Sequence, residues 1–264
     1  MIVQSLNELF SFENLYKAHI KGRLSKRDKK SIVKYKMELM SNLYELYERI
    51  QSGNYHIGAY KRFIVYEPKK RQIQTLNYYD RIVQHVLCDN LLMPYFSKRA
   101  VLDNCVCQIG KGTHFAHNRL KSKLQKLVKR NKADIWCLKC DIKKYFPSLP
   151  HKNLVATFCK HILDRNLKQM IIEIINSFHT NASYLKKHNI EPLGKMQTER
   201  GVPIGNQTSQ VFGMFYLNNL DRLVKEKLRI VVFGVENNSK DVIAGANTQI
   251  SVQVKVLING ESFA

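Results

Sequence analysis

The residue with the clearest potential for chemistry is Asp141, which stands near the end of the apolar stretch 135–142. A short apolar run of this kind predicts a buried strand. A carboxylate at a strand end is held rigidly enough to ligate a metal ion, and nucleotide transfer uses two Mg²⁺ ions about 4 Å apart, held by carboxylates and phosphates. The simpler alternative is an aspartate that caps the following turn, so the neighbouring segments must decide between the two.

Five short segments over about residues 55–230 share their order and spacing with the motifs of one enzyme family. They are 68–73 (PKKRQI), 80–85 (DRIVQH), 110–116 (GKGTHFA), 138–146 (LKCDIKKYF) and 201–210 (GVPIGNQTSQ), which 216–221 (YLNNLD) extends. Together they resemble the reverse transcriptases of the bacterial group-II-intron-like branch. The segment 203–210 is closest to reverse transcriptases of diversity-generating retroelements, since group II intron enzymes usually carry Gln where Ile204 stands. Retron-like and phage-defence relatives share parts of the pattern.

This resemblance implies an RNA-directed DNA polymerase that adds deoxynucleotides to a primer on an RNA template. The implied cofactor is Mg²⁺, with Mn²⁺ as a substitute. The implied partners are a template RNA, a DNA or RNA primer, deoxynucleoside triphosphates and, for this subfamily, a small basic accessory protein. Asp141 would be the catalytic residue and a metal ligand.

The resemblance also implies a nucleotide-binding set on three segments. Lys69 and Arg71, on a basic turn, would hold the triphosphate, because a guanidinium binds phosphate as a bidentate fork. Phe146 would lie under the sugar, and its ring would exclude a 2′-hydroxyl by steric clash. Ile142, next to Asp141, is also part of the implied set. A solvated basic turn and a core-packed phenylalanine are the alternatives.

The loop that holds Pro203, Ile204 and Gly205 would approach the nucleotide with its backbone, and Gln210 on the following helix completes the set. Glycine suits such a loop because it tolerates unusual backbone angles and close approach. Ile204 offers only apolar contact where Gln could donate a hydrogen bond. We therefore hypothesise that Ile204 loosens the discrimination between bases during copying. The hypothesis would be refuted if Ile204→Gln in an intact relative left its error rate unchanged.

The implied fold is α+β: the fingers and a partial palm of a right-hand polymerase, with the thumb absent. We assign 1–54 to an N-terminal helical region, 55–134 to the fingers, 135–230 to the partial palm and 231–264 to a divergent β-like tail. Apolar periodicity and turn residues predict helices over 25–50, 80–92, 113–130 and 208–227, and strands over 63–67, 73–76, 135–141 and 250–256. Ser25 with Asp28 resembles a capping box, and Gly53 and Pro94 are predicted helix ends.

The tail lacks the family's next motif, which is an aromatic residue, any residue and two aspartates. By spacing that pair belongs near Asn238 and Ser239, and residues 231–264 contain no Asp-Asp pair. The tail also holds only two of the 43 basic residues, so its composition changes abruptly near residue 230. We expect a broken or fused reading frame there, with a divergent site using Glu236 or Asp241 as the alternative. A lone Asp141 cannot hold two metal ions, so we expect this chain alone not to extend a primer.

The net charge of +22 favours a polyanionic partner, and nucleic acid is the first choice because neutralised phosphates release counterions. A ribosome-associated or membrane-surface protein is the alternative. No apolar run reaches the roughly 20 residues of a membrane helix, and the start of the chain does not resemble a signal peptide, so we expect a cytoplasmic protein without a membrane partner.

Cys137 and Cys140 have zinc-like spacing. In a strand, however, their side chains point to opposite faces, so both sulfur atoms cannot reach one zinc ion.

Two other functions remain open at this stage. One is a catalytically dead fragment that still binds RNA. The other is a group II intron maturase-like factor, which needs a downstream maturase region. The Asp-Asp pair is the feature that discriminates between an active polymerase and a catalytically dead fragment, and it is missing from residues 231–264.

Overall fold

The computed structural model describes residues 1–66, 71–130, 135–142, 144–179, 199–227, 250–258 and 261–263. Its helices are α1 (Leu6–Leu9), α2 (Phe12–Gly22), α3 (Lys30–Met37), α4 (Leu39–Gln51), α5 (Tyr78–Leu87), α6 (Met93–Ser97), α7 (Thr113–Arg130), α8 (Tyr145–Ser148), α9 (His151–Cys159), α10 (Arg165–Asn176), α12 (Gln207–Tyr216) and α13 (Asn218–Arg222), with π-helical turns η1 (Cys88–Leu92) and η2 (Leu223–Lys227). Its strands are β1 (Lys61–Val65), β2 (Arg71–Thr75), β3 (Ile135–Ile142), β4 (Ile250–Ile258) and β5 (Glu261–Phe263). The mixture of helices with small sheets agrees with the α+β class.

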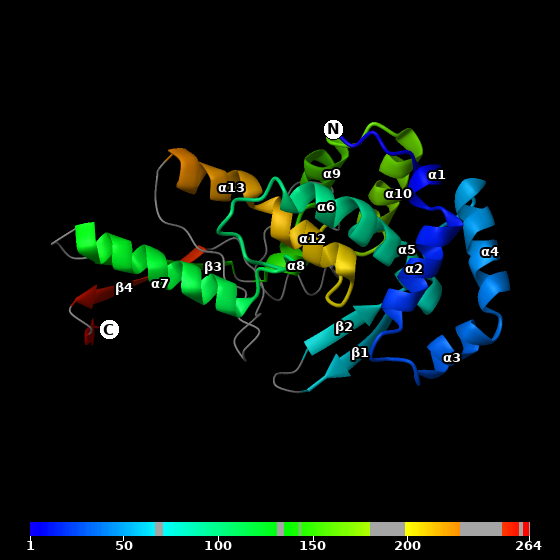
Figure 1. Cartoon of the computed structure of the whole chain (residues 1–264), viewed down its shortest axis with the longest axis horizontal. Coiled ribbons are helices and arrows are strands. Elements are labelled where there is room, and N and C mark those ends of the chain that lie inside the picture. Colours follow the sequence, from blue (N-terminus) through cyan, green and yellow to red (C-terminus); the bar gives the residue numbers. More distant parts are fainter. Residues whose placement is uncertain are drawn as a thin grey trace.

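One hydrophobic core joins the N-terminal helices to the segments around the predicted motifs. The apolar face of α4 is formed by Leu43, Leu46 and Ile50, which are all buried. These side chains pack in one cluster with those of α5, α9, α10 and α12. Figure 1 shows α5 and α12 in the middle of this assembly, with α7 extending away from it.

The single helix predicted over 25–50 is wrong. Ser25 has a left-handed φ of 58°, so it caps nothing, and the chain breaks again at Glu38 between α3 and α4. The break turns Ile32 and Tyr35 of α3 toward the same core that α4 contacts. The Asn42 side-chain amide donates to the Tyr35 carbonyl at 3.0 Å, which satisfies a carbonyl near the end of α3. The predicted helix end at Gly53 is confirmed, with a φ of 73° directly after α4.

The predicted end at Pro94 is also wrong. The chain runs from α5 through η1 into α6, and Pro94 occupies the first turn of α6. The Met93 amide donates to the Cys88 carbonyl five residues back, so a π-helical turn rather than a regular α-helical ladder leads into Pro94. The helix predicted over 208–227 divides in a similar way, since α12 ends at Tyr216 and α13 and η2 follow.

The two predicted hairpin strands are confirmed as β1 and β2, which pair antiparallel with Phe63 opposite Ile73. Strand β3 pairs antiparallel with β4, and Asp141 lies opposite Ser251. The alternating pattern of the tail therefore does form the predicted strand, and it covers the β3 edge. In the part of the chain that the structure describes, no helix has the length and apolar character needed to cross a membrane.

Candidate functional site

The loop 201–205 lies directly beside the segment that follows Asp141. The amide of Val202 donates to the carbonyl of Phe146 at 3.0 Å, and the amide of Gly201 donates to the carbonyl of Leu149 at 2.8 Å. These backbone bonds hold two segments together that are more than fifty residues apart in the sequence. The structure thus joins two of the motifs on which the sequence interpretation depends.

The same loop also contacts strand β2 of the β1–β2 hairpin. The amide of Gln74 donates to the Ile204 carbonyl at 3.0 Å, and the Ile204 amide donates to the Gln74 side-chain oxygen at 3.2 Å. Gly205 follows with a φ of +123°. A Cβ atom there would lie 3.0 Å from the Gln74 carbonyl oxygen and 3.0 Å from the Ile73 side chain. The loop therefore fits against β2 only because residue 205 has no side chain.

Gly205→Ala should open this junction. Alanine is strained at that φ and its methyl group meets the β2 backbone, so we expect a loss of about 1–3 kcal/mol in the free energy of unfolding. Chemical denaturation measures it. Gly112→Ala is the matched control, because a Cβ at Gly112 meets nothing within 4 Å. Equal stability of the two variants would contradict the described packing.

Phe146 lies on the other segment that this loop contacts, and its ring packs against α12. A Cβ atom on Gly213 would lie 2.9 Å from Cε1 of Phe146, so the ring uses the space that this glycine leaves. The neighbouring Tyr145 hydroxyl donates to the Gly213 carbonyl at 2.8 Å, and burial raises the pKa of Tyr145. Phe146 is half-buried, so part of the ring is fixed by packing and part faces outward.

The structure brings some of the predicted site residues together and leaves others apart. Ile204 and Gly205 lie against Gln74, and Phe146 joins the same loop through the Val202 amide; Phe146, Ile204, Gly205 and Gln74 form what we call the cradle. The remaining predicted residues have the following places: Ile142 is half-buried at the end of β3, Pro203 is buried, Gln210 is exposed on α12, Arg71 begins β2, Asp141 lies in β3, and Lys69 lies outside the described residues. For Arg71 and Asp141 the described feature is the backbone position alone.

A cluster around Asp103 was not predicted from the sequence. Its buried carboxylate accepts hydrogen bonds from Arg119 and Lys123 of α7 and from Lys225 of η2. Burial alone would raise the pKa of this carboxyl, but the three cations outweigh it and lower the pKa to about 2. The adjacent Asn104 amide donates to the Met214 carbonyl at 3.2 Å. The loop around Asp103 therefore fastens the basic helix α7 to α12 and η2.

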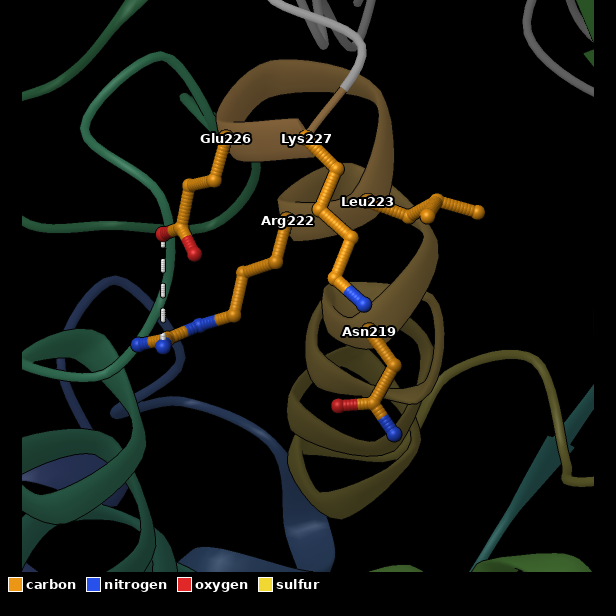
Figure 2. A pocket seen from close by; sticks show the side chains of 5 residues that line it. All are labelled: Asn219, Arg222, Leu223, Glu226 and Lys227. Atoms are coloured by element: carbon orange, nitrogen blue, oxygen red, sulfur yellow. Dashed lines mark ion pairs between the residues drawn. The ribbon is translucent and has the colours of Figure 1, made fainter.

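A surface hollow of about 320 Å³ lies on the last turns of the described helix and is lined by Asn219, Arg222, Leu223, Glu226 and Lys227. Figure 2 shows these side chains around one helical segment, with the Arg222–Glu226 ion pair at 4.0 Å. A larger hollow of about 780 Å³ runs along α7 beside Leu120, Leu124 and Val128. Neither hollow includes a residue of the cradle, so neither is the predicted nucleotide site.

Comparisons with known proteins give structural likeness only. No protein-family model matches the chain. No curated protein matches it in sequence. Among solved structures, it is similar to one chain of a "Partial Cas6-RT-Cas1--Cas2 complex" and one of a "Cas6-RT-Cas1--Cas2 complex", each with 16% identity, a TM-score of 0.48 and 84% of this chain covered. The chain corresponds to 35% and 22% of the length of those two chains, so it spans about a third of them or less.

Proposed function

We propose that this chain carries the nucleotide-binding part of an RNA-directed DNA polymerase, the activity that its motifs imply. The observation that supports the proposal most directly is the convergence of three motifs in the cradle. Val202 bonds to the Phe146 backbone, and Ile204 bonds to Gln74 of the hairpin through two hydrogen bonds. Segments that carry the motifs and lie far apart in the sequence therefore contact the same loop, 201–205.

In this proposal the chain's own residues bind and orient an incoming deoxynucleotide. The backbone of the loop 203–205 forms one wall, and the outward part of the Phe146 ring forms the surface beneath the sugar. The basic turn between β1 and β2 supplies the cations for the triphosphate. The ring selects deoxynucleotides because a 2′-hydroxyl would collide with it.

Phe146→Ala tests this role. Removal of the ring should bring the affinities for a deoxynucleotide and the matching ribonucleotide to within about twofold of each other, because the clash disappears. Competition binding on a primer–template complex measures both affinities. Phe12→Ala on α2, where the ring is half-buried and packs against Tyr47 of α4, serves as the control. Unchanged discrimination in Phe146→Ala would refute the assignment.

Of the metal ligands that the resemblance implies for nucleotide transfer, the sequence supplies only Asp141. Asp141 is placed in β3, and Mg²⁺ would polarise the transferred phosphate when bound beside such a carboxylate. Among the residues that the structure describes, however, no group of three His, Cys, Asp or Glu side chains comes together. Residues 231–264 also lack the Asp-Asp pair that the resemblance calls for, and the Asp141 side chain lies outside the described part of the chain, so we assign no chemical step to a metal centre.

We therefore propose that this chain alone binds primer–template without extending it. Incubation with deoxynucleotides and either Mg²⁺ or Mn²⁺ should leave the primer length unchanged on a sequencing gel. Asp141→Ala is the matched variant and should behave identically. Extension by the unmodified chain that Asp141→Ala abolishes would show that the metal site is complete.

The main competing function is an RNA-binding protein without a nucleotide site. The exposed lysines of α7 support it as well as they support the polymerase. The two functions differ at the cradle, which an RNA-binding protein does not need. Template RNA, a primer and a small basic accessory protein are the partners that the polymerase proposal implies.

A further inference from the structure

Asn206 is placed at the start of α12 but does not cap it. Asparagine at this position normally accepts a hydrogen bond from the first turn of the helix, and here its side chain makes no such bond. Its amide instead donates to the Tyr60 hydroxyl at 3.1 Å. Asn206 is only 4% exposed, so this buried amide is held by the hydrogen bond to Tyr60 and not by the end of the helix.

The hydrogen bonds beyond Tyr60 have one consistent direction. The Ser177 hydroxyl donates to the Ile174 carbonyl at 2.7 Å, so its oxygen is left to accept from the Tyr60 hydroxyl at 3.2 Å. Burial raises the pKa of Tyr60, which keeps this hydroxyl protonated and able to donate. The relay thus runs from Asn206 through Tyr60 and Ser177 into α10.

The segment that carries Tyr60 is itself fixed at several points. Tyr55 donates to the buried Asp80 carboxylate at 2.8 Å, and the Gly58 amide donates to the same group at 3.2 Å. The Ile57 amide donates to Glu173 at 3.0 Å. Residues 55–60 therefore form a strap, anchored to α5 and α10, whose last residue holds the start of α12.

We infer that Tyr60 is a positioning residue for the cradle. Asn206 directly follows Gly205, and Ile204 makes the two hydrogen bonds to Gln74. A fixed Asn206 limits how far the loop 203–205 can shift against β2. The inference rests on the proposed function, because it assigns the strap to the orientation of the nucleotide-binding loop.

Tyr60→Phe removes the hydroxyl and keeps the ring that packs against Phe178 at 5.6 Å. In the full chain bound to primer–template, we expect a matched deoxynucleotide to bind about fivefold to tenfold more weakly, the effect of one lost hydrogen bond. Backbone amides of 203–207 should exchange hydrogen faster. Tyr16→Phe, which removes a hydroxyl from a more exposed ring, should change neither quantity.

A double-mutant cycle separates positioning from general destabilisation. If Tyr60 acts through Asn206, then Tyr60→Phe should add nothing to the loss already caused by Asn206→Ala. Additive losses, or exchange in Tyr60→Phe equal to the unmodified chain, would overturn the inference. If Tyr60→Phe lowers the melting temperature of the whole chain, Ser177→Ala repeats the test one step further along the relay.

The exchange measurement also keeps the two proposals distinct. A chain that binds no nucleotide refutes the proposed function. Faster exchange confined to 203–207 in Tyr60→Phe would still support the positioning of the loop, and unchanged exchange would still overturn it.

Discussion

Asp103→Ala should lower the free energy of unfolding by about 3–5 kcal/mol, the usual cost of removing one partner from a buried ion cluster. The carboxylate is 1% exposed and pairs with Arg119, Lys123 and Lys225, whose mutual repulsion is no longer offset once it is gone. These cations are partly exposed, so water recovers some of the loss and the lower end of the range is expected. Urea denaturation followed by circular dichroism measures the change.

The pH dependence of stability gives an independent test of the same cluster. The folded-state pKa of Asp103 is lowered to about 2, below the value of about 3.9 for an unfolded aspartate. Its contribution is therefore complete above about pH 4 and is lost as the pH falls toward 2. Asp103→Asn should flatten this part of the curve. Asp28→Asn, at an exposed position, should not, and an identical acid profile in both variants would contradict the cluster.

Primer–template affinity should fall by about 10²–10³-fold between 50 and 200 mM salt, as expected for about five phosphate contacts. Helix α7 carries exposed cations at Lys121, Lys126 and Lys129. Replacement of these three lysines by glutamine should reduce the slope of log affinity against log salt by about 2–3. Fluorescence anisotropy over a salt series measures both quantities.

The matched control carries three lysine-to-glutamine changes on α3, at Lys30, Lys34 and Lys36. It alters the net charge equally, and Figure 1 shows α3 at the opposite end of the molecule from α7. A slope that changes equally in both variants would mean that only net charge matters. That result would assign no binding surface to α7.

The sequence predicted the local elements better than the contacts between them. The β1–β2 hairpin and α7 follow from alternation and helical periodicity, which are local patterns. The break at Glu38 was not predictable from periodicity, because it depends on how α3 and α4 share one core.

The long-range hydrogen bonds of the fold have no local signature either. The hydrogen bond between Tyr60 and Asn206 spans 146 residues, and that between Lys225 and Asp103 spans 122. Nothing beside Asp103 or Tyr60 in the sequence predicts those partners. The family resemblance located the cradle residues, and the long-range hydrogen bonds that hold the cradle in place could be found only in three dimensions.

Photo-crosslinking of an azido-deoxynucleotide to the chain on an RNA template with a DNA primer tests the central claim most directly. We expect crosslinks, mapped by mass spectrometry, within 71–75, 142–146 and 201–207, with a yield that depends on a matching template base. Crosslinks concentrated on α1–α4 or along α7, or a yield independent of the template base, would contradict a nucleotide site at the cradle.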